Sequence, residues 1–448
     1  MRPRVWIVGG LEFVVLITIW TVAAWWTSHL SLPRNFGLDM GAYVEAAARI
    51  RTTGTPYSAE LMAGPIANTI DNVPVGYLYP PPLAQLFLFA PSGAWVTVAW
   101  CLAQGVGLAI VLIALGRCAA VRGSLQWISW AVLWVAFLPL SVATYIGNIS
   151  GWIAVGVGLM FLVAPNAASA IGATVAIAKG ITVPVGIAVL ASSSHARRVG
   201  VLSAALACGI SLIALPRAWL DWIRILPNLS EMAPGTAPSN LAFGAVLEPF
   251  GLTALGTLVR LGCLIMALIF LAFAVARRHQ RAAIALGVAA SLVLPATLWD
   301  HHVAVLAVVI AAAWRDATRH EKVALAGCIA VQGVLWTSVT SGPPLVVLVD
   351  IALCAAAVIA IRIHWRADSV AGHGRQETGA KPNPAQDHVI RAVGLAPGRL
   401  SNEKLSQLPA ARSRAGAPPE CRGQPTAGQS TRSASLSRSQ PRAGAWLG

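Results

Sequence analysis

The sequence predicts an all-α polytopic membrane protein, and three observations support this fold class. Hydrophobic residues make up 56% of the 448 residues and charged residues only 11%, which is unlike an ordinary soluble globular chain. Apolar runs separated by short polar breaks recur up to about residue 363. Lys and Arg gather in alternate breaks, as they do in chains that cross a bilayer repeatedly.

The apolar runs predict about 10–12 transmembrane helices. They cover approximately residues 5–26, 83–116 with a break near Pro91, 126–144, 149–164, 167–178, 181–194, 199–215, 252–276, 282–298, 302–314, 322–339 and 344–363. Several runs are shorter than the ~20 residues of a straight crossing, which suits broken or tilted helices around a polar cavity. The first run is too long for the apolar part of a signal peptide, so it is interpreted as a retained span.

The positions of the charged residues orient these spans. With the N-terminus in the cytoplasm, most Lys and Arg residues fall in cytoplasmic breaks, as the positive-inside rule expects. The same threading places these acidic residues outside: Asp39, Glu45, Glu60, Asp71, Asp221, Glu231, Glu248 and Asp300. The sequence therefore predicts a multi-pass protein of the plasma membrane, with both termini in the cytoplasm and its chemistry on the extracytoplasmic face.

Two regions differ sharply in composition. Residues 1–365 hold the apolar runs and are predicted to form one integral membrane domain. Residues 366–448 are rich in Ser, Gly, Pro, Arg and Gln. Such a segment buries too little apolar surface to offset its ordering entropy, so it is predicted to be a disordered basic cytoplasmic tail.

Net charge and cysteine content exclude two other classes. A net charge of +15 would suggest nucleic acid as the partner of a soluble protein, but in a membrane protein the placement of the charges matters more, and no nucleic acid is expected. The seven cysteines lie mostly in apolar runs, with no pair in a polar loop and no metal-ligand spacing. Neither a disulfide framework nor a zinc site is predicted.

The first long polar interruption, about residues 27–82, is predicted to contain the active site. Its opening segment has apolar residues at helical spacing: Met40, Tyr43, Ala47 and Ile50. This pattern indicates a short amphipathic helix on the membrane surface. Asp39 begins that helix, so its carboxylate either caps the helix N-terminus or takes part in chemistry, and the local sequence favours neither.

The same interruption closes with Tyr77-Leu-Tyr79-Pro-Pro-Pro82. Three consecutive prolines fix φ and remove three backbone donors, so this segment is excluded from a helix interior. Taken alone, it is best interpreted as a stiff lead-in to the next span.

Polar residues interrupt the later spans at a few points. Tyr145 to Asn148 closes the third span on the outer side. Lys179 lies between two short apolar runs, where an ammonium group is costly unless it is paired or hydrated, so a substrate role is the default hypothesis. The alternative is a lysine at a helix end that extends to the membrane surface.

Further polar residues follow on the predicted outer face. They are Asn240, and then Trp299-Asp300-His301-His302 at the outer end of a span. Neighbouring positions on a helix diverge by about 100° and rarely supply two ligands to one ion. The two histidines are therefore predicted to form hydrogen bonds or handle protons rather than bind a metal.

These positions, taken in order, resemble glycosyltransferase family 87 over about residues 5–363. The resemblance rests on Asp39-Met-Gly-Ala-Tyr43, Tyr77-Leu-Tyr79-Pro-Pro-Pro82, Gly147-Asn148, Lys179 with Pro184, Asn240 and Trp299-Asp300-His301-His302. The family comprises GT-C-type membrane mannosyltransferases of actinobacteria that use polyprenol-phosphate-mannose as donor. The resemblance implies transfer of mannose to a cell-envelope glycolipid or lipoglycan, with inversion to an α-mannoside, α-1,2 being the expected linkage.

The resemblance also implies roles for individual residues. Asp39 would be the base that deprotonates the acceptor hydroxyl, because inversion requires a carboxylate on the face opposite the leaving group. Lys179 would supply positive charge to the leaving phosphate, and His301 or His302 would donate hydrogen bonds to it. The remaining substrate-binding candidates are Tyr43, Tyr77, Tyr79, Asn148, Asn240 and Asp300. Neither a nucleotide cofactor nor a metal ion is implied.

Two other classes of function stay open from the sequence. Short helices and cavity-facing charges would also suit a transporter or lipid flippase, although no internal repeat of the Asp39 or Asp300 motif is apparent. A non-catalytic scaffold of a cell-envelope assembly is the third possibility. Within the enzyme hypothesis, the sequence does not identify the acceptor.

Overall fold

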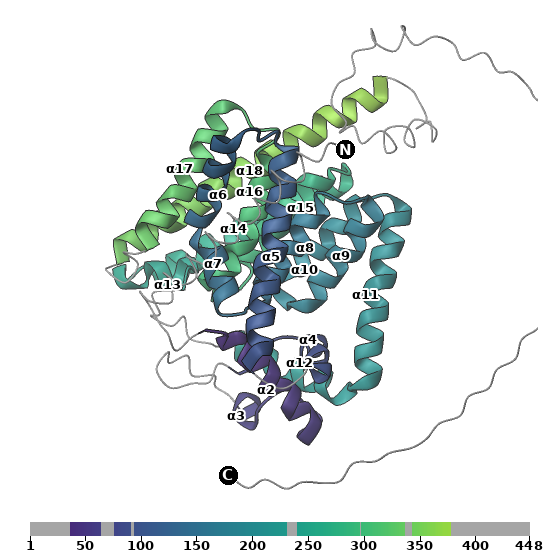
Figure 1. The fold of residues 1–448 in the computed structure, drawn as a ribbon. Helices are drawn as coiled ribbons and strands as arrows, with labels where there is room; N and C mark the ends of the chain where they lie inside the picture. Colours follow the sequence, from purple (N-terminus) through teal and green to yellow (C-terminus); the bar gives the residue numbers. More distant parts are fainter. Residues whose placement is uncertain are drawn as a thin grey trace, which may run out of the picture. The chain divides into compact units, whose positions relative to one another are not determined.

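The computed structural model describes residues 36–63, 76–90, 94–230, 240–295, 297–336 and 343–377 (Figure 1). Over these residues the regular structure is helical, apart from one isolated antiparallel bridge between Asn240 and Trp299. The predicted all-α fold class is confirmed. The predicted first span at residues 5–26 and most of the predicted tail lie outside the described residues.

Four of the described helices are long and apolar enough to cross a membrane by themselves. They are α5 (Ala94–Cys118), α11 (Ser194–Ala214), α14 (Thr253–Ala276) and α18 (Pro343–Glu377). A fifth candidate is the pair α6 (Ser124–Ala136) and α7 (Leu138–Tyr145), which bends by 64°. Pro139 lies in the first turn of α7, where its missing N–H and fixed φ interrupt the preceding helix.

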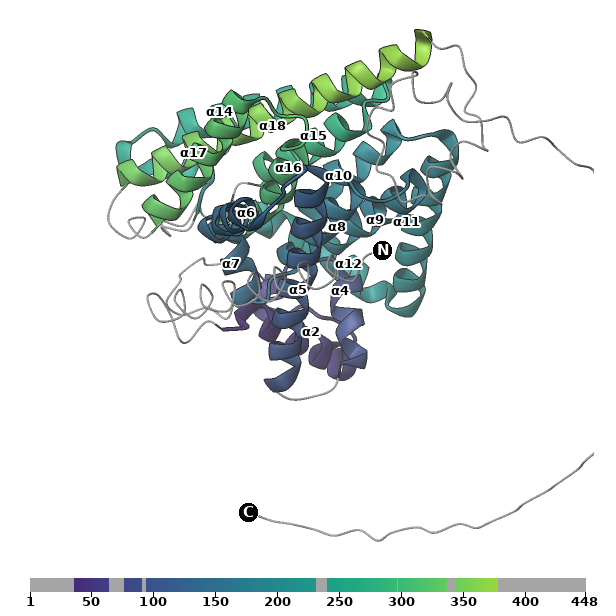
Figure 2. The ribbon, with the colours of Figure 1, turned by 45° about the horizontal axis from the view of Figure 1, so that its top comes forward.

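The other apolar helices are shorter. They are α8 (Ile149–Met160), α9 (Pro165–Ala178), η3 (Gly180–Thr182), α10 (Val183–Ala188), η4 (Val189–Ala191), α15 (Gln280–Val293), η6 (Asp300–Val303) and α16 (Ala304–Ala313). α17 (Arg319–Trp336) lies beside α18 (Figure 2), and α13 (Phe243–Leu247) and η5 (Glu248–Phe250) precede α14. These boundaries match the predicted runs closely, whereas the number of membrane crossings stays a prediction.

The core of the bundle surrounds α16. All ten of its residues are buried, as expected of a helix that is apolar on every side. It packs against α8, which in turn packs against α5. Small residues permit this close approach: a Cβ at Gly158 of α8 would lie 2.3 Å from Val111 Cγ1 of α5 and 3.4 Å from Val308 of α16.

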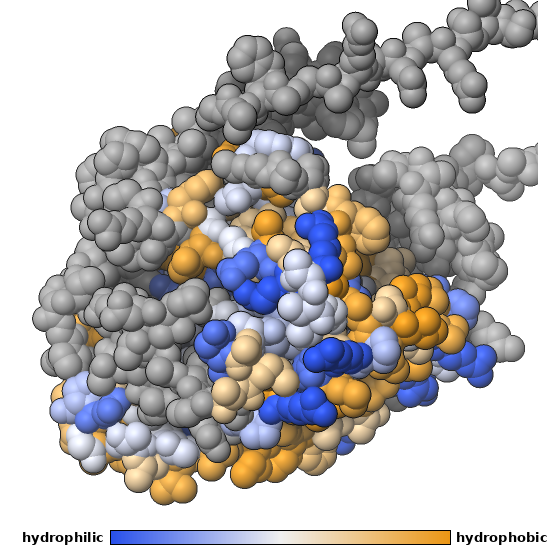
Figure 3. All heavy atoms as spheres, turned by 90° about the horizontal axis from the view of Figure 1, so that it is seen from below, coloured by the Kyte–Doolittle hydropathy of each residue, from blue (hydrophilic) through white to orange (hydrophobic). Residues whose placement is uncertain are grey.

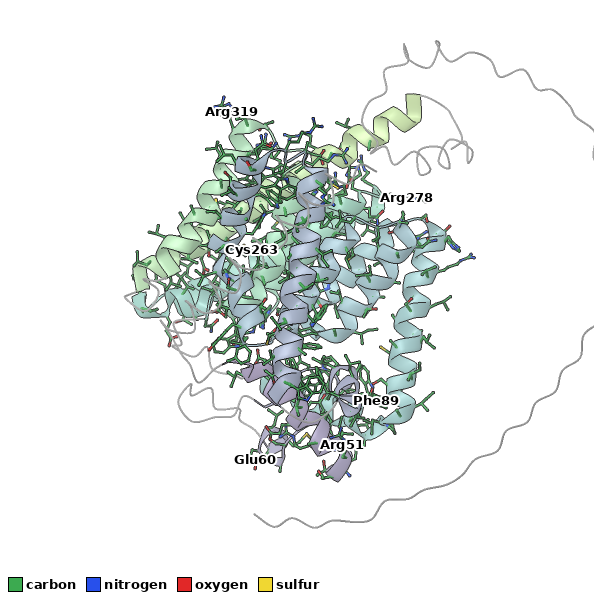
Figure 4. All side chains as sticks on the ribbon, in the orientation of Figure 1. Arg51, Glu60, Phe89, Cys263, Arg278 and Arg319 are labelled. Atoms are coloured by element: carbon green, nitrogen blue, oxygen red, sulfur yellow. The ribbon has the colours of Figure 1, made fainter. Side chains whose placement is uncertain are left out.

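Short helices cover one end of the bundle. They are α2 (Leu38–Thr53), α3 (Ala59–Ala63), α4 (Pro81–Leu86), η2 (Phe87–Phe89) and α12 (Pro216–Ser230), all at the bottom of Figure 1. Arg51, Glu60 and Phe89 lie at this end, whereas Arg278 and Arg319 lie at the opposite end (Figure 4). Figure 3 looks onto the end with the short helices and shows hydrophilic residues beside hydrophobic ones.

Ion pairs join several helices near the start of α15. Arg281 pairs with Asp316, and Arg366 of α18 pairs with Glu321 of α17 at 2.9 Å. Asp368 accepts a hydrogen bond from the backbone N–H of Ala282, in the first turn of α15. These contacts attach α18 to α15 and α17 at residues 366 and 368, and the helix itself ends at Glu377.

Candidate active site

The first turn of α2 fixes the position of Asp39. The Gly37 and Asp39 N–H groups donate 3.0 Å hydrogen bonds to the Tyr145 and Ile146 carbonyls, at the end of α7. Gly37 itself precedes the helix with φ of 68°, and a Cβ there would lie 2.1 Å from Thr97 Cγ2. Only glycine fits such a position. Gly37, not Asp39, is thus the N-cap residue, and the capping interpretation of Asp39 is wrong.

Asn148 connects Asp39 to the rest of the site. It is fully buried and is the N-cap of α8, where its Oδ1 accepts a 2.7 Å hydrogen bond from the Ser150 N–H. This bond turns the amide Nδ2 toward Asp39 Oδ2 at 2.6 Å and Tyr79 Oη at 2.9 Å. The capping bond therefore orients the donor that holds the Asp39 carboxylate.

Lys179 lies in the break between α9 and η3, and its ammonium turns into the bundle. Its Nζ donates to Ser150 Oγ at 2.9 Å, lies 3.4 Å from Asn148 Oδ1 and stands 5.3 Å from the centroid of the Tyr79 ring. The residue is only 5% exposed, so the alternative of a lysine extending to the membrane surface is wrong. Burial lowers the pKa of Lys179 to about 7, against the opposing effect of the Asp39 carboxylate.

Four of the five tyrosines of the chain gather around this network: Tyr43, Tyr57, Tyr77 and Tyr79, with ring centroids 5.4–6.3 Å apart. Tyr43 Oη accepts a hydrogen bond from the Ile149 N–H at 3.0 Å. Tyr77 Oη accepts one from the Ala84 N–H at 2.9 Å and donates one to the Pro80 carbonyl.

Burial determines what these tyrosines can do. Tyr43 and Tyr77 are fully buried, and burial raises the pKa of both hydroxyls well above 10. They are therefore neutral groups that fix the backbone around Pro80 and Ile149. Tyr79 is partly buried, and its hydroxyl lies directly beside the Asn148 amide.

The prolines at residues 80–82 begin a helix, as a stiff lead-in should. Pro80 is the N-cap of α4 and Pro81 opens the first turn, where the missing N–H costs no hydrogen bond. The element that follows is the short α4 rather than the membrane span, which begins later with α5.

A second polar group forms where Asn240 meets the segment before α16. Asn240 Oδ1 accepts hydrogen bonds from the N–H groups of Ala242 at 3.1 Å and Leu298 at 3.0 Å. Asp300 Oδ1 accepts a 2.6 Å hydrogen bond from the His301 N–H and lies 3.2 Å from His301 Nδ1. This segment packs against α7 and the start of α8, and the charge of Lys179 acts on the His302 ring.

Three buried polar atoms in this second group have no hydrogen-bond partner within the described part of the chain. They are Asn240 Nδ2, Thr297 Oγ1 and His302 Nδ1. Leaving such atoms unpaired is costly, so they are suited to receive polar groups of a bound substrate.

The structure thus brings the predicted site residues into two adjoining groups. Asp39, Tyr43, Tyr77, Tyr79, Asn148 and Lys179 form the first, and Asn240, Asp300, His301 and His302 form the second. The described residues hold no cluster of three or more His, Cys, Asp and Glu side chains suited to a metal ion. That the site needs no metal ion stays a prediction.

Comparison with known families decides the class of this site. The model of glycosyltransferase family 87 matches residues 77–299. The chain belongs to glycosyltransferase family 87. No curated protein and no solved structure gives a significant match.

Membership of this family makes the protein a membrane glycosyltransferase, with a lipid-linked donor and an acceptor. It favours the enzyme over the transporter, flippase and scaffold alternatives. The matched region begins at Tyr77 and ends at Trp299, so it contains Asn148 and Lys179 and stops just before Asp300. Asp39 precedes it, and its assignment to the site depends on the contact with Asn148.

An apolar cavity of about 410 Å³ lies beside the polar site of this glycosyltransferase. Helices α9, α10, α11 and α12 supply most of its walls. Pro80 and Gly180 also line it, and they are the chain neighbours of Tyr79 and Lys179. The cavity therefore lies close to the polar network along the chain, although neither Tyr79 nor Lys179 lines it.

Sequence reasoning missed three residues of the site. Tyr57 donates a 2.9 Å hydrogen bond to the Tyr79 carbonyl, and Thr297 carries one of the unpaired hydroxyls. Ser150 accepts the Lys179 hydrogen bond. Only Ser150 had a recognisable signature, since it lies two residues after the Asn148 cap.

Proposed function

We propose that this glycosyltransferase moves mannose from polyprenol-phosphate-mannose to a cell-envelope glycolipid or lipoglycan with inversion, giving an α-1,2-mannoside. The observation that carries the proposal is the buried chain of contacts from Asp39 through Asn148 to Lys179, adjoining an apolar cavity. A carboxylate, a cation and an apolar chamber are the three elements that transfer from a lipid phosphate to a hydroxyl requires.

Asp39 is the proposed base. Asn148 Nδ2 holds one carboxylate oxygen at 2.6 Å, which leaves the other oxygen to accept the proton of the acceptor hydroxyl. The hydroxyl oxygen then attacks the anomeric carbon as the bond to the phosphate oxygen breaks, so the configuration inverts. Fixing the carboxylate beforehand removes the cost of orienting it during reaction.

Lys179 is the proposed stabiliser of the leaving phosphate. A polyprenyl phosphate departs as an anion, so it needs positive charge rather than a general acid. An ammonium group acts more strongly in a buried site than in water, and Lys179 is 5% exposed. The Lys179 charge acts on the His302 ring, which contacts His301, and these two residues are the proposed additional hydrogen-bond donors.

The apolar cavity is the proposed chamber for the polyprenyl chain near the phosphate. Its wall contains Ile177, Val183, Ile187 and Leu190, together with Gly186 and Gly200. The acidic and aromatic end of the bundle, with α2, α3 and α4, is the proposed extracytoplasmic face. The opposite end, with Arg278 and Arg319 (Figure 4), would face the cytoplasm.

Transfer of radiolabelled mannose tests this proposal. Membranes containing the wild-type protein, given polyprenol-phosphate-mannose, should label envelope lipids, and Asp39→Asn should abolish labelling at unchanged protein level. Glu45→Gln is the matched control, since Glu45 is an exposed carboxylate on the same helix that pairs only with Arg49 among the described residues. Equal labelling by Asp39→Asn and wild type would refute the assignment of the base.

A further inference from the structure

Helix α12 changes the direction of the chain at the end of a membrane span. Only Leu215 separates α12 from α11, and Pro216 cannot continue the α11 hydrogen-bond pattern. Figure 1 shows α12 crossing the end of the bundle beside α4, away from the line of α11. Ile213, in the last turn of α11, is 86% exposed, so apolar surface reaches the point where α12 begins.

The side chains of α12 divide into three stripes. Ala218, Asp221 and Ile225 are buried against the protein. A second stripe, consisting of Leu220, Ile223 and Leu226, is 40–57% exposed. The third stripe is cationic: the side chains of Arg217 and Arg224 are 75% and 69% exposed.

Asp221 does not cancel the two cations. Its carboxylate lies 3.9 Å from Arg217 Nε and 3.4 Å from Arg224 Nη1, but its side chain is only 5% exposed. One carboxylate offsets at most one of the two positive charges, and both arginine side chains stay largely exposed. This stripe keeps a net positive charge.

We propose that α12 lies in the membrane interface and binds anionic lipid headgroups. Its exposed apolar stripe enters the acyl boundary, and Arg217 and Arg224 contact headgroup phosphates. An amphipathic helix with an apolar face and a cationic edge is the form that lies in this plane, and arginine binds phosphate well. The apolar surface of α11 and that of Leu86 (60% exposed) and Phe89 (89% exposed) point to the same lipid layer.

The proposal concerns attachment to the leaflet and is independent of the sugar or acceptor used. It does bear on the cavity, because Trp219 and Trp222 of α12 line it. Headgroups bound to the arginines of α12 would therefore fix the position of Trp219 and Trp222, which form part of the cavity wall.

Cysteine labelling of purified protein in lipid nanodiscs tests the position of α12. Ile223→Cys and Leu220→Cys are treated with a charged, membrane-impermeant maleimide, with wild type as background for the seven native cysteines. Glu60→Cys is the reference, since Glu60 is exposed at the same end of the bundle (Figure 4). We expect both α12 variants to react at least about tenfold more slowly than Glu60→Cys, because their thiols lie among acyl chains.

Lipid composition tests the role of the arginines. Replacing about a third of the phosphatidylcholine by phosphatidylglycerol should slow labelling of Ile223→Cys by about fivefold, the effect of one charge at an anionic surface. Adding Arg217→Gln and Arg224→Gln should remove this difference. Adding Arg197→Gln and Arg198→Gln, at the other end of α11, should preserve it.

Two results would overturn the proposal. Labelling of both α12 variants as fast as Glu60→Cys in every nanodisc would place the helix in water. Fast labelling in nanodiscs together with protection in native membranes would assign the surface to a protein partner instead. Neither readout uses catalysis, so a failure here is distinguishable from a failure of the mannosyltransferase assignment.

Discussion

Removing the buried ammonium group should weaken use of the lipid donor. In Lys179→Met a flexible apolar chain of similar length replaces the lysine, and Asp39 keeps its hydrogen bond from Asn148, so the fold should persist. Ser150 Oγ loses its 2.9 Å donor, whereas Asn148 Oδ1 keeps the Ser150 N–H. Hydrogen bonds to charged groups contribute about 1.5–3 kcal/mol, so kcat/KM for polyprenol-phosphate-mannose should fall about 10- to 150-fold.

The same lysine predicts a pH dependence whose sign follows from its pKa. Burial lowers the pKa of Lys179 to about 7, so the free enzyme carries the cation below pH 7 and loses it above. The donor phosphodiester stays anionic throughout this range. The wild-type kcat/KM for the donor should therefore be highest below pH 7 and fall by up to about tenfold per pH unit above it, since kcat/KM reports groups of the free enzyme.

Steady-state transfer assays in nanodiscs between pH 5.5 and 9 would measure both effects. Lys322→Met, which removes a lysine from the start of α17, is the control and should match wild type. The reasoning fails if Lys179→Met keeps kcat/KM within about twofold of wild type, an energy below that of a charged hydrogen bond. It also fails if the variant retains the wild-type decline above pH 7.

Three further substitutions test other parts of the site and core. Asn148→Ala removes the 2.6 Å donor to Asp39 and should lower kcat by about tenfold or more in the transfer assay. An unchanged kcat would show that Asn148 does not orient the base. Tyr77→Phe deletes the hydroxyl that bonds Pro80 and Ala84, so thermal unfolding in detergent should show a loss of about 1–3 kcal/mol, and unaltered stability would contradict this role. Gly158→Val should reduce the yield of folded protein in size-exclusion chromatography, because a Cβ there meets Val111 at 2.3 Å. Gly262→Val, in open space on α14, should fold normally, and equal yields would disprove the packing argument.

The sequence and the membrane topology predicted from it together placed most of the polar site residues on the predicted extracytoplasmic face. Asp39 stood out at the start of an amphipathic segment, Asn148 at the outer end of a predicted span and Lys179 between two short apolar runs. Their contacts could not be predicted: the hydrogen bond from Asn148 to Asp39 spans 109 residues, and no local pattern encodes a pairing of that range. The competing capping role of Asp39 was excluded only by the position of Gly37.

Elements without a long apolar run were the ones overlooked. Helix α12 has apolar and charged residues in stripes, so its mean hydropathy is modest and a search for spans passes over it. The bend between α6 and α7 was also missed, although Pro139 was visible within the predicted run at 126–144. Tyr57 lies in an otherwise polar stretch, where only the fold reveals its ring against Tyr77.

The hydrogen bond between Asp39 and Asn148 also has a consequence for biosynthesis. The segment with Asp39 leaves the ribosome more than a hundred residues before its partner amide, and Lys179 follows later still. Since a chain is synthesised from its N-terminus, the first turn of α2 cannot form its contacts with α7 and α8 until those helices have been made. A nascent or truncated chain ending before residue 148 would carry the carboxylate without its orienting amide, and one ending before residue 179 would lack the cation. On the proposed mechanism, sugar transfer thus requires a chain made beyond Lys179, and partly assembled chains would not consume lipid-linked sugar.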